Sequence, residues 1–415
     1  MENINEILQQ AATASVIVRK LGANIKQTVL ENIAQALTLN ADEIIAQNHL
    51  DLVKMPDADS KKDRLLLNHE RINSLAASIA EIAQLQDPTN QVLSSKNLVN
   101  GLFIQKKTVA LGVVGVIYES RPNVTVDVAA LCIRSGNSCL LRGGSDAFHT
   151  NIILVNIIQS VLRTFQLDEN IVQLLPVDRK HVYELLTADK YVDIIIPRGS
   201  QQLIDFVREN AKVPVIETGA GVCHTYVDAT ADLDKAAKIV CNAKVTRPSV
   251  CNSLDTLIVD EEISAELLEK LAPLLLPFEV EIFADENSYP ILIKLGYPYL
   301  QRADIEDFGR EFLSLKCSIK TVKTLDEALA HIHQYSSKHS EAIVSKNEEN
   351  IERFVNEVDA AAVYSNASTR FTDGGEFGLG AEIGISTQKL HARGPFALEK
   401  LVTEKWFVRG NGQVR

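Results

Sequence analysis

Val109-Ala-Leu-Gly-Val-Val-Gly-Val-Ile117 is an unbroken run of apolar and glycine residues. A strand that helices cover on both sides has this composition, because neither of its faces meets water. Sheets covered on both faces are built from parallel strands. The run therefore predicts the buried strand of an α/β domain, and the sequence on either side of it should supply the covering helices.

Downstream of this run, short apolar strands alternate with amphipathic stretches, and the alternation starts again after Arg247-Pro248. This pattern indicates parallel βαβ units. We therefore expect two doubly wound α/β domains with a boundary near Thr246. The predicted strands are Ser138–Leu141, Val172–Leu175, Val192–Ile196, Val213–Ile216, Leu254–Val259, Val280–Phe283, Cys317–Val322, Ala342–Ser345 and Ala361–Tyr364. The predicted helices are Ser145–Phe165, Ser200–Asn210, Glu261–Leu274, Leu325–His333 and Glu348–Val358.

Upstream of the run, apolar residues recur at helical spacing until Asp87-Pro88, where proline ends the pattern. The segment 97–109 is typical of an exposed hairpin, and the tail 398–414 is typical of a strand. Both are expected to pair across subunits. The chain is therefore expected to form a homo-oligomer, and the sequence leaves dimer and tetramer open.

Composition limits the kind of partner. The 415 residues are 46% hydrophobic and 23% charged, and 42 basic against 54 acidic side chains give a net charge of −12. An acidic surface disfavours nucleic acid and anionic membranes, but small anionic ligands depend on local arginines. The six cysteines form no C-x-x-C pair, and the N-terminus resembles no secretory signal. A cytoplasmic protein with reduced thiols is expected.

Two glycine-containing turns are candidates for phosphate binding. Arg142-Gly143-Gly144-Ser145 lies where a predicted strand gives way to a helix, so backbone amides, the helix N-terminus and a guanidinium would meet there. An ordinary turn with Ser145 as helix cap explains the same residues equally well. Pro197-Arg198-Gly199-Ser200 repeats the arrangement more weakly.

Cys251 is the candidate nucleophile. It lies in a polar break between two apolar periods, at the expected domain boundary, and Arg247 nearby would favour its thiolate. A lone cysteine more commonly packs in the hydrophobic core and takes no part in chemistry. Glu217-Thr218-Gly219 follows a predicted strand, where α/β ligand sites form, although a solvated carboxylate is the plainer interpretation. The histidines at 331, 333 and 339 lack ligand spacing, and no metal site is expected.

Taken in order, these segments resemble the aldehyde dehydrogenase superfamily, and most closely its branch that reduces glutamate 5-phosphate in proline biosynthesis. The resemblance covers essentially the whole chain. The stretches that carry it are Tyr118-Glu-Ser-Arg-Pro-Asn-Val-Thr125, Leu141-Arg-Gly-Gly-Ser145, Val245-Thr-Arg-Pro-Ser-Val-Cys251-Asn252 and the segment 325–343.

The resemblance implies a reaction and three catalytic residues. NADPH would reduce L-glutamate 5-phosphate to L-glutamate 5-semialdehyde, through a thioester on Cys251. Asn123 matches the asparagine that holds the oxyanion together with the backbone N–H of the cysteine. Glu217 matches a glutamate that activates water in hydrolytic relatives, and its role here is open because this reduction needs no water.

The resemblance also implies a cofactor site. Arg142 takes the place of the family's adenosine-ribose lysine, and Ser145 stands where NAD-preferring members carry a carboxylate, which favours NADPH. The remaining matched positions are Gly143, Gly199, Ser200, Thr218, Gly219 and Glu311. Residues 1–246 would then form the NADPH-binding domain and 247–380 the catalytic domain, with 381–415 returning to the first and ending in an oligomerisation strand.

Two arginines are candidates for binding the substrate, and two other functions are alternatives to the reductase. Arg121 and Arg247 flank Asn123 and Cys251, and either could bind the anionic groups of the substrate or form a structural salt bridge. The runner-up function is a hydrolytic dehydrogenase that acts on a small aldehyde. A non-catalytic scaffold is the third possibility, and the presence of Cys251, Asn123 and Glu217 together argues against it.

Overall fold

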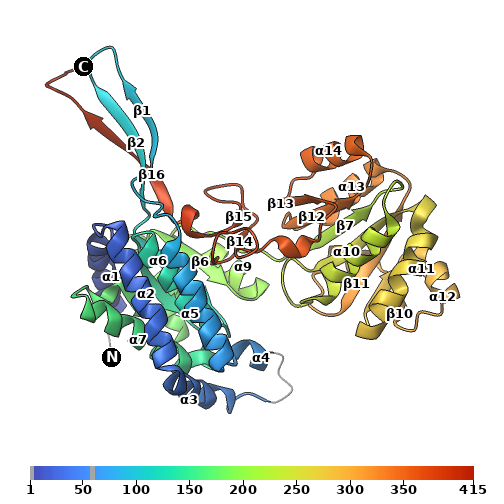
Figure 1. Ribbon diagram of the computed structural model, residues 1–415, viewed down its shortest axis with the longest axis horizontal. Coiled ribbons are helices and arrows are strands. Elements are labelled where there is room, and N and C mark those ends of the chain that lie inside the picture. Colours follow the sequence, from blue (N-terminus) through green and yellow to red (C-terminus); the bar gives the residue numbers. More distant parts are fainter. Residues whose placement is uncertain (1–3, 57–60) are drawn as a thin grey trace. The chain divides into compact units, whose positions relative to one another are not determined.

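The computed structural model describes residues 4–56 and 61–415 (Figure 1). The chain separates into two compact units. The first unit holds residues up to Thr218 together with Gly378–Gly384 and Leu390–Arg415, and the second holds Gly219–Phe377 together with Ile385–Lys389. The predicted α/β class is confirmed in both units.

The first unit is built on a four-stranded parallel sheet with strand order β5-β4-β3-β6. All six residues of β3 are buried. Val114 and Val116 lie in one apolar cluster with the helices α2, α5, α6 and α7, whereas Val113 and Ile117 lie in another with α1 and α8. The strands are β3 (Val113–Tyr118), β4 (Ser138–Arg142), β5 (Val172–Leu174) and β6 (Ile194–Arg198). The helices are α1 (Ile4–Val18), α2 (Ala23–Leu39), α3 (Ala41–Leu52), α4 (Lys61–Leu65), α5 (His69–Gln84), α6 (Pro122–Arg134), α7 (Phe148–Thr164), α8 (Arg179–Leu186) and α9 (Gln201–Asn210).

The prediction that 109–117 is one strand is wrong at its start. The chain breaks at Gly112, whose φ is +135°. A Cβ atom there would lie 2.1 Å from Asp193 Oδ2, which accepts the N–H of Val113 at 2.8 Å. Glycine is therefore required where the chain turns into β3.

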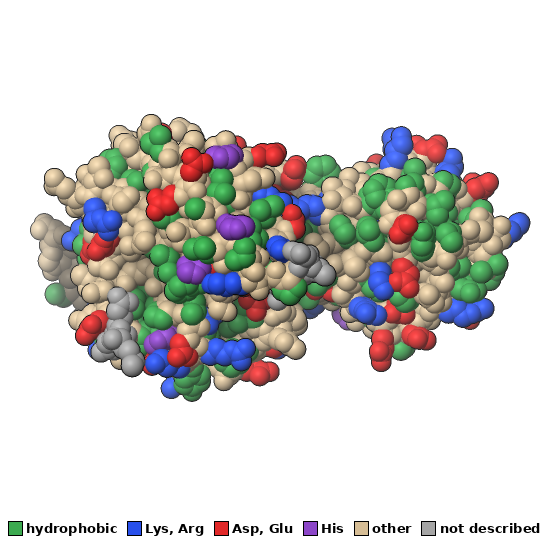
Figure 2. Space-filling view, turned by 90° about the horizontal axis from the view of Figure 1, so that it is seen from below, with side chains coloured by type: hydrophobic (Ala, Val, Ile, Leu, Met, Phe, Trp, Pro, Cys, Tyr) green, Lys and Arg blue, Asp and Glu red, His purple; other side chains and the backbone are tan. Residues whose placement is uncertain are grey.

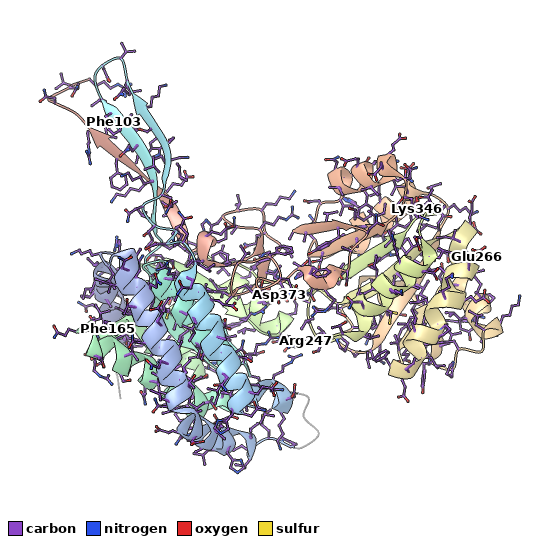
Figure 3. The ribbon with its side chains drawn as sticks, viewed as in Figure 1. Phe103, Phe165, Arg247, Glu266, Lys346 and Asp373 are labelled. Carbon is purple, nitrogen blue, oxygen red and sulfur yellow. The ribbon has the colours of Figure 1, made fainter. Side chains whose placement is uncertain are left out.

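A three-stranded antiparallel sheet extends away from the helices of the first unit (Figure 1). Its strands are β1 (Val92–Asn97), β2 (Phe103–Ala110) and β16 (Val402–Arg409), so the hairpin begins before the predicted residue 97. The predicted tail strand is confirmed as β16, which pairs along the whole of β2. Side chains stand out from both faces of this arm, where Phe103 is labelled in Figure 3. Trp406 and Val408 are exposed.

The second unit contains a seven-stranded parallel sheet with strand order β10-β9-β11-β8-β7-β12-β13. The strands are β7 (Cys223–Val227), β8 (Leu254–Asp260), β9 (Glu281–Ala284), β10 (Leu300–Arg302), β11 (Lys316–Val322), β12 (Ser340–Val344) and β13 (Ala362–Ser365). The helices are α10 (Leu233–Val245), α11 (Ser264–Leu275), α12 (Ser288–Lys294), α13 (Leu325–Tyr335) and α14 (Glu348–Glu357). The helices α10 to α12 share one apolar cluster with the sheet and α13 and α14 share the other, so both faces are covered. The short strand β14 (Ile385–Ser386) also belongs to this unit, whereas β15 (Gly394–Pro395) belongs to the first.

The expected domain limit after residue 246 falls inside the second unit. The strand β7 and the helix α10 precede that residue, and both pack into the core of the second sheet. The predicted strand 213–216 forms a single bridge between Ile195 and Val215 and no ladder. The chain therefore leaves the first unit at Thr218.

Acidic and basic side chains are interspersed over both units on the face that Figure 2 shows. On this face an anionic ligand would therefore meet individual basic side chains rather than a broad basic surface. Within the described residues, no helix combines the length and the apolar character needed to cross a membrane.

A buried ion pair in the first unit provides a stability test. Lys26 Nζ lies 2.5 Å from Asp87 Oδ2, and the two side chains are 1% and 12% exposed. Burial lowers the pKa of Lys26, and Asp87 opposes that shift. We expect Asp87→Ala to lower the free energy of unfolding by about 3–5 kcal/mol, because it strands a buried cation. Denaturant unfolding followed by circular dichroism measures this.

The double variant Lys26→Met/Asp87→Ala is the control for this pair. Removing both charges avoids an unpaired buried ion, so the double variant should be more stable than Asp87→Ala alone. If both variants lost the same free energy of unfolding, the ion pair would not be the cause.

Candidate active site

Cys251 lies in the second unit, in the turn between α10 and β8, and its side chain is partly exposed. The N–H of Val250 donates to the carbonyl of Arg247 at 3.4 Å, and the N–H of Ser253 donates to the carbonyl of Val250 at 3.0 Å. Arg247 is exposed in this turn, and Figure 3 labels it at one end of the unit. Arg247 and Cys251 therefore lie in one turn.

The backbone carbonyl of Cys251 is held from two sides. A Cβ atom on Gly221 would lie 1.6 Å from that oxygen, so the backbone there passes in direct contact with Cys251. The thiol of Cys223 donates to the same oxygen at 3.2 Å. Burial raises the pKa of Cys223 well above its usual value, so this thiol stays neutral and remains a donor.

Glu311, which is distant in the sequence, contacts the backbone at Gly221. Its Oε1 accepts the N–H of Gly221 at 2.8 Å. The next residue, Phe312, donates its N–H to Asp255 Oδ1 at 3.0 Å. Gly221, Cys251 and Glu311 are therefore brought together within the second unit. Gly219 is in the same unit, where a Cβ atom would lie 3.1 Å from Thr387 Oγ1.

Asp255 forms a buried pair with Lys244 that sequence reasoning missed. Lys244 Nζ lies 3.8 Å from Asp255 Oδ1, and the two side chains are 0% and 3% exposed. Burial raises the pKa of Asp255 to about 7, although Lys244 opposes the shift, and burial lowers the pKa of Lys244. The available signal was an acidic residue near the start of a predicted strand whose other residues are apolar except for Thr256.

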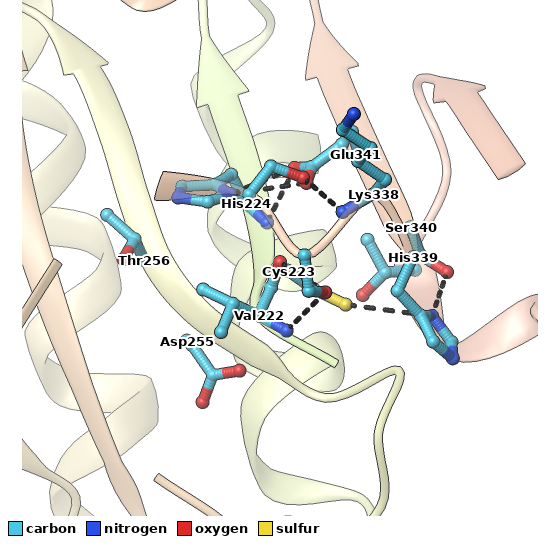
Figure 4. A network of polar contacts seen from close by, with 12 residues as sticks. Val222, Cys223, His224, Asp255, Thr256, Lys338, His339, Ser340 and Glu341 are labelled. Atoms are coloured by element: carbon cyan, nitrogen blue, oxygen red, sulfur yellow. Dashed lines mark hydrogen bonds and ion pairs between the residues drawn. The ribbon is translucent and has the colours of Figure 1, made fainter. Parts of the chain in front are cut away.

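A polar network surrounds the start of β7 (Figure 4). The N–H of His224 donates to Glu341 Oε2 at 2.8 Å, and its ring Nδ1 lies 3.1 Å from the same oxygen. The N–H of Val222 donates to Ser337 Oγ at 2.8 Å. His331 packs against His224, and burial lowers the pKa of His331 to about 3, which keeps it neutral.

The first unit holds Arg121 and Asn123 at the start of α6. Arg121 is the residue that precedes the helix, and Pro122 occupies its first turn. The side chain of Asn123 is exposed, and its Nδ2 donates to Asp127 Oδ2 at 3.3 Å. Burial raises the pKa of Asp127 to about 6, although Asn123 and Arg198 oppose it. Asp127 was missed, and its position one helical turn after Asn123 was the available signal.

Arg142 ends β4, with its Nη2 donating to the carbonyl of Val177 at 2.6 Å. Within the described part of the chain its buried Nε has no partner, and burial together with Arg179 lowers its pKa. Gly143 is a packing glycine, since a Cβ atom there would lie 2.2 Å from Asn151 Nδ2.

Ser145 begins a short 3-10 helix, Ser145–Ala147, without acting as its cap. The residue that follows it, Asp146, carries a carboxylate that accepts a hydrogen bond from Ser120. The charge of Asp146 also acts on Arg142 and raises its pKa, against the larger effect of burial. A carboxylate is therefore present close to Arg142, which the sequence argument from Ser145 did not consider.

Gly199 and Ser200 lie at the N-terminus of α9, where Ser200 Oγ accepts the N–H of Leu203 at 3.4 Å. The N–H of Ser200 donates to the carboxylate of Glu119 at 3.1 Å. This helix terminus therefore already holds an anion, as its dipole favours. Glu119 was missed because it is far from Ser200 in the sequence.

Glu217 and Thr218 are the last residues of the first unit before the chain enters the second. Glu217 Oε2 lies 3.5 Å from Arg208 Nη1 on α9. Thr218 Oγ1 donates to the carbonyl of Pro197 at 2.7 Å, which places it beside the turn of Gly199. The predicted site residues thus form one group in each unit.

The contact between Gly221 and Cys251 gives a second test. We expect Gly221→Ala to lower the thermal midpoint, at a cost of at least about 2 kcal/mol, because a methyl group cannot fit against a backbone carbonyl. Differential scanning calorimetry measures it. Gly22→Ala is the matched control, since nothing lies within 4 Å of its Cβ position. Equal midpoints for the two variants would contradict the contact.

Comparisons with known proteins place the chain in a family. A family model for the aldehyde dehydrogenase family matches residues 1–286. A gamma-glutamyl phosphate reductase from Chlorobaculum parvum is 52% identical over 419 residues, covering 100% of this chain and 99% of the relative. One from Legionella pneumophila is 51% identical over 410 residues, with 98% of each chain covered.

A solved structure shows the same relationship. The crystal structure of gamma-glutamyl phosphate reductase from Thermotoga maritima matches with a TM-score of 0.94 at 42% identity, and the match covers 100% of both chains. The chain belongs to the aldehyde dehydrogenase family and, within it, to the group of gamma-glutamyl phosphate reductases.

Proposed function

We propose that the protein reduces L-glutamate 5-phosphate to L-glutamate 5-semialdehyde with release of phosphate, a step of proline biosynthesis. Full-length identity of about half to gamma-glutamyl phosphate reductases supports this activity. The observation that carries it in the structure is the partly exposed Cys251, whose backbone is clamped by Gly221 and Cys223. A nucleophile needs a thiol that substrate can reach on a backbone that does not move.

The proposed reaction begins at Cys251. Its thiolate attacks the acyl carbon, a C–S bond forms, and the C–O bond to phosphate breaks with its electron pair leaving on phosphate. The resulting thioester is reduced to a thiohemiacetal, which collapses to the aldehyde and the free thiol. Asn123 Nδ2 and the N–H of Cys251 would stabilise the oxyanion, and each such donor lowers the barrier by about 3 kcal/mol.

Glu217 is proposed to transfer protons rather than to activate water, because reduction of an acyl phosphate consumes no water. Its proximity to Arg208 at 3.5 Å keeps a cation beside the carboxylate. Arg121 and Arg247 are proposed to bind the anionic groups of the substrate. Arg121 directly precedes α6, whose first turn carries Asn123, and Arg247 lies in the turn that carries Cys251.

Members of this family use a nicotinamide cofactor, which supplies the hydride when it is bound. The residues present fit such a group. Arg142 offers a half-buried guanidinium with an unpartnered Nε within the described chain, and the backbone N–H of Ser200 at the α9 terminus is a donor for anions, as its hydrogen bond to the Glu119 carboxylate indicates. The residues proposed to hold the cofactor are Arg142, Gly143, Ser145, Gly199, Ser200, Thr218, Gly219 and Glu311.

NADPH is the proposed form of the cofactor. Arg142 is proposed as the cation that binds the 2′-phosphate. Because it is partly buried, a bound dianion would stabilise its charge more than it would stabilise an exposed arginine. The alternative function, hydrolytic oxidation of a small aldehyde, is not favoured by the relatives, whose names are those of reductases. Such a hydrolytic enzyme would oxidise its aldehyde in the absence of inorganic phosphate.

The oligomer and the compartment are also proposed. The arm of β1, β2 and β16 extends from the first unit with apolar side chains exposed, among them Val92, Leu93, Trp406 and Val408, which supports its use in a homo-oligomer. A nucleophilic thiol needs a reducing compartment, which supports a place in the cytoplasm.

Replacement of the nucleophile tests the proposed chemistry. We expect Cys251→Ser to reduce NADPH oxidation with glutamyl phosphate by at least about a thousandfold, because a hydroxyl is a far weaker nucleophile. Absorbance of NADPH measures turnover. Cys317→Ala removes a buried thiol from the same unit and should keep activity. Full activity of Cys251→Ser, or oxidation of the semialdehyde that does not depend on phosphate, would refute the proposal.

The cofactor preference is tested at Arg142. We expect Arg142→Ala to raise KM for NADPH at least about tenfold, because a charge-assisted contact is lost, and to leave KM for NADH nearly unchanged. Steady-state kinetics with both cofactors measure the ratio. Arg163→Ala removes an exposed arginine of the same unit that pairs with Glu169, and serves as control. Parallel increases for both cofactors would exclude a 2′-phosphate contact.

A further inference from the structure

Arg370 is bound to the residue that follows the candidate nucleophile. It lies in the 3-10 helix Thr369–Phe371 after β13, and its guanidinium donates from Nη1 to the side-chain oxygen of Asn252. The amide Nδ2 of Asn252 donates to the carbonyl of Thr372 at 2.8 Å, and Thr369 Oγ1 donates to the carbonyl of Asn252 at 2.8 Å. These contacts fix Arg370 to the Cys251 turn.

The guanidinium of Arg370 is half-buried and incompletely bonded. Its Nε is buried and has no hydrogen-bond partner among the described residues. Burial lowers its pKa, and the charge of Arg247 lowers it further. Asp373 and Cys251 oppose this shift. Figure 3 labels Arg247 and Asp373 at the same end of the unit.

Two cations close together, one with an unbonded N–H, would be stabilised by an anion bound between them. The proposed substrate carries two anionic groups, a carboxylate and a phosphate. The phosphate is joined through one oxygen to the carbon that Cys251 attacks, whereas the carboxylate is several bonds away. An arginine fixed to residue 252 is therefore suited to the phosphate, whose paired oxygens match a guanidinium fork.

We propose that Arg370 binds the phosphate group of the acyl phosphate and stays with it as it leaves, an assignment that rests on the proposed function. As the C–S bond forms and the C–O bond breaks, the electron pair moves onto phosphate, and the guanidinium neutralises the charge that develops. No oxidation occurs in this step. In the reverse direction Arg370 holds inorganic phosphate for attack on the thioester.

The reverse reaction tests Arg370 directly, using inorganic phosphate as the probe. The protein is assayed for oxidation of glutamate 5-semialdehyde by NADP⁺ at varied phosphate concentrations. We expect Arg370→Gln to raise KM for phosphate at least about tenfold, because a charged hydrogen bond is lost, while KM for NADP⁺ stays unchanged. Arg370→Lys keeps the charge without the fork and should lie between the two.

Arg353→Gln is the matched control. Arg353 is an exposed arginine of the same unit that pairs with Asp326 and Glu357, and its variant should keep the KM for phosphate. Unchanged KM for phosphate in Arg370→Gln would overturn the assignment. If the glutamine variant fails to fold, a wild-type KM for phosphate in Arg370→Lys would overturn it as well.

A second measurement does not require turnover. Phosphate bound beside Cys251 should slow alkylation of that thiol by iodoacetamide, and peptide mass spectrometry at residue 251 follows it. We expect phosphate to protect the wild-type protein and Arg353→Gln, but not Arg370→Gln. Activity that survives in Cys251→Ser would refute the proposed function itself. An inactive Cys251→Ser beside an Arg370→Gln that phosphate still protects would refute the Arg370 assignment alone.

Discussion

The contact between the backbone at Gly221 and the carbonyl oxygen of Cys251 is the constraint on which the candidate site depends. No side chain fits between them, since a Cβ atom would lie 1.6 Å from that oxygen. Glu311 holds the N–H of Gly221, and Asp255 holds the next residue after Glu311. Asp255 is itself buried beside Lys244. Two hydrogen bonds from backbone N–H groups, one to Asp255 and one to Glu311, therefore connect this buried charge pair to the backbone that contacts the Cys251 turn.

The architecture was largely predictable from periodicity, and the departures have local causes. An apolar run such as 113–117 can hardly be anything but a buried strand, and it lies between two clusters as expected. The break at Gly112 is set by Asp193, which approaches from a distant segment and leaves no trace in the run itself. The predicted domain boundary at residue 246 lies too late in the sequence. The segment that forms β7 mixes polar and apolar residues, so neither this strand nor the helix after it was recognised as the start of the second unit.

Candidate site residues can be proposed from the sequence where motif and chemistry coincide, as at Cys251, but not where long-range contacts decide which side chains meet. Glu119 at the terminus of α9 and Asp255 behind Glu311 are of the second kind, because their partners are distant in sequence. Asp127, one turn after Asn123, was within reach of helix geometry alone. A single sequence identifies reactive side chains more readily than the residues that orient them, since orientation arises only when separate segments meet.

An acidic chain that handles anionic molecules must concentrate its positive charge locally. The two arginines proposed to bind anions, Arg142 in the first unit and Arg370 in the second, share three features: each is half-buried, each has a buried Nε without a partner among the described residues, and each has a second arginine near enough to lower its pKa. Burial costs free energy while the charge is poorly solvated, and a bound dianion offsets that cost. Such a site would favour an anionic ligand over a neutral one, because a neutral ligand in the same position would leave the buried cation without a compensating charge.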